Sequence, residues 1–226
     1  MPILKSKVLS SVIHGFSTRH VGCDVSYIAS KHELSQIAQL KQVHSSNIIV
    51  VDDIQSHDNE IEGDALITTL KGVGIGVRTA DCVPILITDK DHTLAAAVHA
   101  GWRGSVSEIA KKTVQKIETD YGVSSSDLKV TIGPCNKKCC YEVGEDVASL
   151  FKEKFSNTSL YLFPIANSKY YLDLSIANKS ALQEAGVQEL ETIGVCTECN
   201  PNYYSYRREG KGVGTQLSFI ALPKEC

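Results

Sequence analysis

The sequence predicts a layered α/β protein in which helices pack outside a mixed β-sheet, and three observations support this fold class. Continuous apolar runs with β-branched residues occur at 72–77, 82–88 and 94–99, as expected for strands buried on both faces. Segments with apolar residues at helical spacing follow these runs along the chain. The 226 residues contain no internal repeat and no linker rich in Pro, Gly and Ser. A single domain over 1–226 is therefore the simplest organisation.

Three segments have the periodicity of amphipathic helices. The apolar residues of 105–121 recur every three or four positions, and Gly122 is a suitable end for this helix. A second helix is predicted over 145–155. A third is predicted over 174–185, with Asp173 as its N-cap and Gly186 as its terminator.

The other segments have weaker signals. Residues 21–39 have little periodicity, and only a helix over 31–40 is predicted there. A strand is predicted over 129–132. In the last third of the chain, the segments ETIGVC, NYYSYRRE and TQLSFIAL are separated by turns and predict three further strands.

Charge and hydropathy exclude several classes of protein. The formal net charge is -3 and no basic cluster is present, so nucleic acid and anionic membrane surfaces are not expected partners. No run of 18 apolar residues predicts a membrane span, and the N-terminus does not resemble a signal peptide. We therefore expect a cytoplasmic protein whose eight cysteines are thiols or metal ligands rather than disulfides.

Three residues in separate motifs are candidate metal ligands. They are His44 in KQVHSSN, Cys82 in RTADCVPIL and His99 in AAAVHAGWRG. Cys82 begins one predicted strand and His99 ends another, and functional groups of α/β proteins gather at strand ends. Zinc accepts thiolate and imidazole ligands, and three protein ligands leave a fourth position for water or substrate. The alternative is a hydrogen-bonded core histidine beside a small buried cysteine.

A second group of cysteines offers a competing interpretation. The group forms a C-x-x-x-C-C motif and a C-x-x-C motif, and comprises Cys135, Cys139, Cys140, Cys196 and Cys199. Four of these thiols have the chemistry of a structural zinc site. We nevertheless expect free thiols, because a chain of this length is large enough to fold without a structural metal ion.

Three arginines are candidates for binding an anion. Arg103 follows Gly101 and Trp102 at the start of a predicted helix, where backbone N–H groups favour negative charge. Arg207 lies in YSYRREG and Arg78 in the segment before Cys82. Guanidinium groups bind phosphate with several donors, so these residues are candidates for an oxyanion pocket beside the metal. The alternative for each is a surface ion pair.

The chain resembles the YfiH-like laccase-domain family, also called polyphenol oxidoreductase laccases or multifunctional purine nucleoside enzymes. The motifs that carry the resemblance span about residues 14–222; they are HGFSTRH, QVHSSN, GDALITT, RTADCVPILITD, AVHAGWRGSV, IGPC, YEVG and YSYRREGKGVGTQLSFI. The resemblance implies a layered α-β-α fold distantly similar to the cytotoxic necrotizing factor catalytic domain. It also implies a zinc ion on His44, Cys82 and His99.

The same resemblance implies an activity. It implies phosphorolysis of adenosine, inosine and methylthioadenosine, and hydrolytic deamination of adenosine, with purine nucleosides and phosphate as ligands. Copper-dependent phenol oxidation is the older assignment of the family, which makes copper the alternative metal. This chain departs from the family in two places. The segment between HGFSTRH and QVH is short, and Thr215 follows Gly214 where the family has an arginine.

The leading hypothesis is thus a zinc-dependent purine nucleoside phosphorylase and adenosine deaminase with His44, Cys82 and His99 at its centre. Asp64 and Asp81 are candidates for proton transfer by their position, and Arg78, Arg103 and Arg207 for phosphate binding. A zinc-bound water with a pKa near ~7 is the expected nucleophile of deamination.

Three alternatives remain open. The first is a metal-free hydrolase or deamidase with Cys82 as nucleophile and His99 as base. The second is a copper-dependent phenol oxidase, although seven histidines are few for a cluster of several copper ions. The third is a nucleoside-binding protein without chemistry. The sequence leaves open the oligomeric state and the preferred nucleoside.

Overall fold

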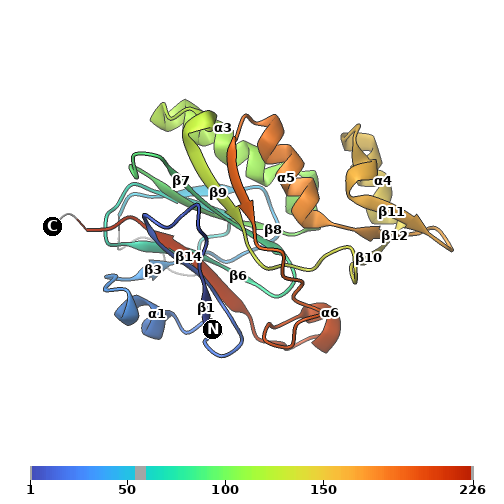
Figure 1. The fold of residues 1–226 in the computed structure, drawn as a ribbon, viewed down its shortest axis with the longest axis horizontal. Helices are drawn as coiled ribbons and strands as arrows, with labels where there is room; N and C mark the ends of the chain where they lie inside the picture. Colours follow the sequence, from blue (N-terminus) through green and yellow to red (C-terminus); the bar gives the residue numbers. More distant parts are fainter. Residues whose placement is uncertain (1, 54–59, 225–226) are drawn as a thin grey trace.

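Two large β-sheets packed face to face form the centre of the molecule, and helices cover their outer faces (Figure 1). The computed structural model describes residues 2–53 and 60–224. Within these residues, no helix has the length and apolar character needed to cross a bilayer. The α/β class is as predicted, but one mixed sheet between two helical layers is not what forms.

The larger sheet has six strands and carries most of the functional site. Its strands, in spatial order, are β13 (Glu189–Thr192), β9 (Leu128–Ile132), β7 (Val83–Asp89), β8 (Ala95–Ala100), β5 (Ala65–Thr68) and β4 (Ile48–Val51). The four central strands β9, β7, β8 and β5 are antiparallel to one another, and the edge strands β13 and β4 pair in parallel with β9 and β5. All seven residues of β7 are buried, which explains its continuous apolar sequence.

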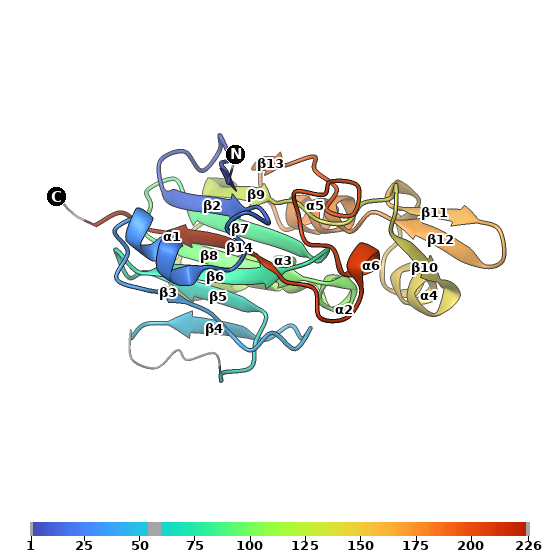
Figure 2. The same cartoon turned by 90° about the horizontal axis from the view of Figure 1, so that it is seen from below.

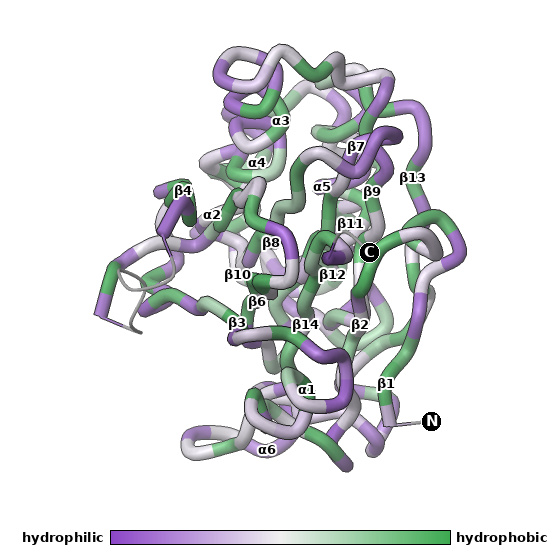
Figure 3. Tube along the Cα trace, turned by 90° about the vertical axis from the view of Figure 1, so that its left-hand side faces the viewer, coloured by the Kyte–Doolittle hydropathy of each residue, from purple (hydrophilic) through white to green (hydrophobic). Residues whose placement is uncertain are grey.

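The second sheet covers one face of the first. Its strands, in spatial order, are β1 (Ile3–Leu4), β2 (Ile13–Ser17), β14 (Gln216–Ala221), β6 (Gly74–Thr79) and β3 (Ile37–Ala38). Phe16, Ile75 and Ile220 from this sheet share one apolar cluster with Leu86 and Ala97 from the larger sheet. A strand buried by a second sheet has the same apolar sequence as one buried by helices, so the sequence did not distinguish the two arrangements. Figure 3 shows hydrophobic residues along strands such as β2 and β14.

Helices cover the other face of the six-stranded sheet. Helices α3 (Ile109–Tyr121) and α5 (Leu174–Glu184) lie side by side on it (Figure 1). As predicted, the Asp173 side chain caps α5, accepting a hydrogen bond of 3.2 Å from the backbone N–H of Ile176. The predicted helix over 105–121 is in fact divided, because Glu108 at φ 57° separates α3 from the short helix α2 (Trp102–Val106).

A small antiparallel sheet lies at the periphery beside helix α4 (Glu145–Lys154) (Figure 2). Its strands are β10 (Glu142–Gly144), β12 (Lys169–Leu172) and β11 (Leu162–Ile165). Strand β10 of this sheet begins directly after Tyr141, a residue that lines the active-site pocket.

Two predicted elements were wrong. No helix spans 31–40: helix α1 (Val25–Lys31) ends where it was expected to begin, and β3 lies inside the predicted range. The reason is a cap, because Asp24 accepts from the backbone N–H of Tyr27 at 2.9 Å and starts the helix early. The segment NYYSYRRE is not a strand but contains helix α6 (Tyr206–Glu209), capped by the Ser205 side chain.

Candidate active site

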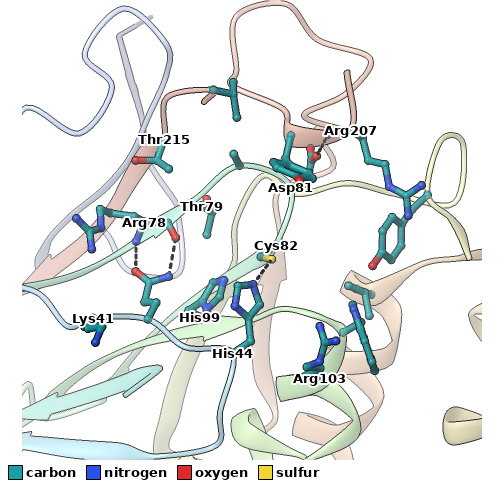
Figure 4. A pocket seen from close by; sticks show the side chains of 17 residues that line it. Lys41, His44, Arg78, Thr79, Asp81, Cys82, His99, Arg103, Arg207 and Thr215 are labelled. Carbon is teal, nitrogen blue, oxygen red and sulfur yellow. Dashed lines mark hydrogen bonds between the residues drawn. The ribbon is translucent and has the colours of Figure 1, made fainter. Parts of the chain in front are cut away.

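His44, Cys82 and His99 converge at one end of the central strands (Figure 4). His44 lies in the loop before β4, Cys82 directly precedes β7, and His99 is in β8. Their ligand atoms all lie within 4.8 Å of one another. Sγ of Cys82 is 3.9 Å from Nε2 of His44, and the two imidazole rings meet edge to face at a centroid distance of 4.9 Å.

Strand register is what brings two of these residues together. Strands β7 and β8 are antiparallel with Pro84 opposite His99, so Cys82 and His99 emerge at the same end of the sheet. The β5–β8 ladder continues past Ala65, where the backbone N–H of His99 donates to the carbonyl of Asp64 at 2.7 Å. Asp64 therefore lies directly beside His99 although the two residues are far apart in sequence.

The fully buried carboxylate of Asp64 holds both histidines in place. It accepts from Nδ1 of His99 at 2.8 Å and from the backbone N–H groups of Val43, His44 and Ser45 at 3.3, 3.0 and 2.6 Å. The Ser45 hydroxyl donates to it as well, at 2.8 Å. A carboxylate only accepts hydrogen bonds, so Nδ1 of His99 carries a proton and Nε2 is the atom left for a ligand.

The same contacts set the charge of the site in the metal-free protein. Burial would raise the pKa of Cys82, but the His99 charge and hydrogen bonds from His44 and His99 lower it to about 6. Burial would lower the pKa of His99, but the Cys82 thiolate and Asp64 raise it to about 9. Burial also opposes ionisation of Asp64, yet hydrogen bonds from His99 and Ser45 lower its pKa to about 2. Without a metal ion, the thiolate of Cys82 and the imidazolium of His99 thus each favour the charged form of the other.

The residues present fit a metal ion with three protein ligands. A thiolate sulfur and an imidazole nitrogen on one tetrahedral zinc ion lie about 3.6 Å apart, close to the 3.9 Å between Cys82 and His44. Gly101 keeps the space beside them open. A Cβ atom at this position would lie 2.9 Å from Cδ2 of His44 and 3.1 Å from Sγ of Cys82.

Two residues of the site have unusual backbone conformations. His44 has φ 59° and Asp81 has φ 97°, both in the left-handed region that non-glycine residues rarely adopt. Such conformations persist only where surrounding contacts fix them. The hydrogen bond from the His44 N–H to Asp64 supplies one such contact. The Asp81 carboxylate accepts from Thr197, Ser205 and the backbone N–H of Arg207, at 2.6, 3.1 and 2.8 Å.

A pocket of about 660 Å³ opens above the three ligands (Figure 4). This volume lies in the range that small organic ligands occupy. Three aromatic side chains line it, those of Trp102, Tyr141 and Tyr206. The remaining lining combines polar, charged and aliphatic residues; it comprises Lys41, Gln42, His44, Arg78, Thr79, Ala80, Asp81, Cys82, His99, Arg103, Leu174, Arg207, Val213 and Thr215.

Cationic side chains lie on both sides of the ligands. Arg103 and Arg207 lie on one side, and Arg78 and Lys41 on the other (Figure 4). Arg103 stacks on Trp102 at 4.1 Å, and Arg207 lies 4.9 Å from the Tyr141 ring while donating to the carbonyl of Glu142.

None of the three arginines forms an ion pair with a described residue. Lys41, in contrast, pairs with Glu62 at 2.8 Å. The surface ion pair that sequence reasoning left open for Arg78, Arg103 and Arg207 is thus not seen in the described part of the chain. Their charges are available to an anionic ligand.

All but one of the predicted site residues line the pocket. His44, Arg78, Asp81, Cys82, His99, Arg103 and Arg207 all line the pocket. Asp64 lies behind His99, where its carboxylate is fully engaged and fully buried. This position suits a residue that orients a ligand better than one that exchanges protons with a substrate.

Sequence reasoning did not single out Gln42, Tyr141 and Tyr206. Gln42 forms two hydrogen bonds with the backbone of Arg78, accepting at 2.8 Å and donating at 2.7 Å, and so fixes the strand end that carries it. The sequence signal that could have identified Gln42 is its position in the KQVHSSN motif, two residues before His44. Thr215, where the family resemblance predicts an arginine, lines the pocket on the same side as Arg78 (Figure 4).

Comparisons with known proteins extend the description. A family model described as multi-copper polyphenol oxidoreductase laccase matches residues 14–223. A purine nucleoside phosphorylase of Clostridium acetobutylicum is 39% identical over 83% of this chain and 77% of its own length. The adenosine deaminase RL5 of an unknown prokaryotic organism is 35% identical over 83% of this chain and 76% of its own. The crystal structure of YlmD from Geobacillus stearothermophilus superimposes with a TM-score of 0.87 at 26% identity, covering 99% and 97% of the two chains.

Proposed function

The chain belongs to the multi-copper polyphenol oxidoreductase laccase family, and we propose that it is a metal-dependent purine nucleoside phosphorylase and adenosine deaminase. Relatives with these two activities in their names match most of the chain. The observation that carries the proposal is the convergence of His44, Cys82 and His99 on the floor of a pocket with aromatic and cationic walls.

We assign His44, Cys82 and His99 as the ligands of one zinc ion. Thiolate and imidazole suit zinc, and the Asp64–His99 contact is the hydrogen bond that histidine ligands of zinc usually make. When bound, zinc supplies a Lewis acid that makes water acidic enough to lose a proton near neutral pH. Binding requires His99 to release its Nε2 proton, so the affinity for the metal falls as the pH falls.

In phosphorolysis, an oxygen of phosphate bonds to C1′ of the ribose while the bond from C1′ to the purine breaks. The products are ribose 1-phosphate and the free base. Arg103 and Arg207, which lie on the same side of the pocket, are suited to bind the phosphate dianion (Figure 4). The stacked pair of Arg103 and Trp102 offers a planar surface on which a purine can stack.

In deamination, water adds to the purine carbon that carries the amino group, and ammonia leaves. The residues of the chain must orient the purine and transfer a proton to the departing nitrogen. Asp81 provides the single carboxylate on the described lining, and its Oδ1, which accepts one hydrogen bond, from Thr197, retains a lone pair. We therefore assign the proton transfer to Asp81.

The test of this function is a nucleoside panel. Purified protein loaded with zinc is incubated with inosine, adenosine and methylthioadenosine, with and without phosphate, and the products are separated by chromatography. We expect free base from all three nucleosides only when phosphate is present, and inosine from adenosine in its absence. Binding of nucleosides without any product would contradict the proposal and leave a nucleoside-binding protein.

One observation favours a second function, that of a metal-free cysteine hydrolase or deamidase. Cys82, His99 and Asp64 are arranged as a nucleophile, a base and a residue that orients the base, and the pKa of Cys82 is lowered to about 6. Metal content distinguishes the two functions. If one equivalent of zinc is present and protects Cys82 from alkylation, the site is a metal centre. Rapid alkylation of the protein as purified, without zinc, supports the hydrolase.

The ligand set favours a single ion over a cluster of copper ions. Among the residues described, one group of three or more potential ligands contains histidine, and that group is His44, Cys82 and His99. Copper competes with zinc for such ligands by intrinsic affinity, so metal analysis of the purified protein decides between them. Phenol oxidation with stoichiometric copper would contradict the assignment of zinc.

A further inference from the structure

Four cysteines outside the active site form a second cluster. Cys139, Cys140, Cys196 and Cys199 have ligand atoms that all lie within 4.8 Å of one another. The sulfur of Cys199 is 3.1 Å from that of Cys140 and 3.5 Å from that of Cys139, and the last two are 3.6 Å apart. The fifth member of the sequence group, Cys135, is buried and lies outside the cluster.

Backbone pairing between two loops produces this convergence. Cys135 and Cys196 form an isolated parallel bridge beyond the ends of β9 and β13. The N–H of Cys135 donates to the carbonyl of Val195 at 3.3 Å, and the N–H of Thr197 donates to the carbonyl of Cys135 at 3.0 Å. The C-x-x-C turn that begins at Cys196 thereby faces the Cys-Cys pair at 139–140.

The sulfur spacing fits one metal ion better than the alternatives. Four sulfurs bound to a zinc ion at about 2.3 Å occupy the corners of a tetrahedron with edges of about 3.8 Å. The three sulfur separations among Cys139, Cys140 and Cys199, from 3.1 to 3.6 Å, are shorter than this edge, and all of them greatly exceed the length of a disulfide bond, about 2.05 Å. A set of four thiolates leaves no position for water or substrate, which is the pattern of a structural site.

We propose that Cys139, Cys140, Cys196 and Cys199 bind a second zinc ion, which fixes the loops 134–141 and 193–200 against each other. This inference goes beyond the proposed function and replaces our expectation of free thiols. A chain of this length does not need a metal ion to fold. The two loops, however, are joined by a single isolated β-bridge rather than by a regular strand pairing.

The site would support one wall of the active-site pocket. From the first loop, the backbone N–H of Asn136 donates to the carbonyl of Asp81 at 2.8 Å. From the second loop, the Thr197 hydroxyl donates to the carboxylate of Asp81 at 2.6 Å. Arg208 donates to the carbonyls of Thr197 and Glu198 at 2.8 and 2.6 Å and so attaches the second loop to helix α6. The proposed zinc therefore lies behind Asp81 and Arg207 and does not contact the substrate pocket.

The test is the number of zinc ions per chain, measured by elemental analysis. The protein is purified under reducing conditions, incubated with zinc, and then exchanged into zinc-free buffer. We expect two ions in the wild type and one in Cys139→Ser and in Cys199→Ser. The variant Cys82→Ala, which lacks the active-site thiolate, should also retain one. The combination of Cys82→Ala with Cys199→Ser should retain none. Cys135→Ala is the matched control, a neighbouring thiol outside the cluster, and should retain two.

Cobalt provides a readout that does not depend on activity, and its first arm, in Cys82→Ala, leaves the four cysteines of the cluster intact. In Cys82→Ala, cobalt should give the intense thiolate-to-metal charge-transfer absorption of four sulfur ligands, and Cys82→Ala with Cys199→Ser should lose it. One zinc ion in the wild type together with none in Cys82→Ala would overturn the proposal. A disulfide among Cys139, Cys140 and Cys199 in the reduced preparation, detected by mass spectrometry, would overturn it too. Iron in place of zinc would refute the assignment of the metal.

Discussion

Asp64 and His99 are joined twice, by a side-chain hydrogen bond of 2.8 Å to Nδ1 and by a backbone hydrogen bond of 2.7 Å between the His99 N–H and the Asp64 carbonyl. The second bond belongs to the register of β5 and β8, and the first sets the tautomer of a proposed metal ligand. The fold of the sheet and the chemistry of the site thus depend on the same pair of residues.

The first prediction concerns this pair. Asp64→Asn replaces a carboxylate that accepts from five donors with an amide that also carries two donors of its own. We expect zinc affinity at the active site to fall by about ten- to a hundredfold, the usual effect of losing an outer partner of a ligating histidine. Competition with a chelator measures it. Glu62→Gln, which breaks only an exposed ion pair, is the control, and an equal loss of affinity there would contradict the role of Asp64.

The second prediction concerns Gly101, whose backbone at φ -70° suits alanine as well as glycine. In Gly101→Ala the new methyl group meets the His44 ring and the Cys82 sulfur, so one ligand must shift. We expect zinc binding to weaken by about tenfold, or about 1.4 kcal/mol, with little change in thermal stability of the metal-free protein. Gly194→Ala, where a Cβ meets no atom within 4 Å, should change neither quantity.

The third prediction separates the two proposed activities. Arg207→Ala removes a guanidinium group from the pocket wall, and loss of a charge-assisted contact is worth about 1.5–3 kcal/mol, or about ten- to a hundredfold. The value of kcat/KM for phosphate in the phosphorolysis of inosine should fall by this factor. The rate of adenosine deamination without phosphate should fall much less. Initial rates against phosphate concentration measure the difference. Lys211→Ala, on the exposed segment nearby, is the control. Equal losses of both activities would assign Arg207 to the nucleoside or to the scaffold.

The fourth prediction concerns Cys82, the single anionic ligand of the proposed active-site metal. Cys82→Ala should abolish both phosphorolysis and deamination and remove one equivalent of zinc, because two neutral imidazoles hold the ion weakly. Rates and metal content are measured on the same sample. Retention of zinc together with full activity would refute the assignment of the metal centre.

The fifth prediction concerns the pH dependence of stability at a position remote from the site. Burial opposes ionisation of Glu191, but hydrogen bonds from Ser6 and from the backbone N–H groups of Val8 and Lys7 lower its pKa below the ordinary value. A carboxyl whose pKa is lowered by folding stabilises the fold above its unfolded pKa, and this contribution is lost as the pH falls through the folded value.

Glu191→Gln should therefore destabilise the protein by on the order of 1 kcal/mol at neutral pH, and the difference from the wild type should shrink on acidification. Denaturation by urea at pH values of about 7 and about 3.5 measures this. A difference that grows toward low pH would show that the sign is wrong. Glu189→Gln on the same strand is the control, since its exposed side chain lacks these contacts.

The three candidate ligands His44, Cys82 and His99 could be picked out from the sequence because each one lies at the end of a strongly apolar run or in a specific motif, and the structure brings them together. Helix α5 was predictable for a similar reason, since its cap and its periodicity are local signals. The partner of His99 was not, because the pairing of β5 with β8 joins residues that are distant in sequence. For the same reason, the sequence did not predict the packing of one sheet on the other or the contact between Cys139 and Cys199. Helix α6 was missed because a serine cap and one turn leave no periodicity to detect.

The division of the pocket between two parts of the chain has an evolutionary consequence. His44, Asp64, Cys82 and His99 all come from residues 44–99, whereas Tyr141, Leu174, Tyr206, Arg207, Val213 and Thr215 come from later segments. A lineage can therefore alter the later wall, and with it the choice of base or the demand for phosphate, while inheriting the metal ligands unchanged. Thr215, where the family resemblance predicts an arginine, belongs to this later wall.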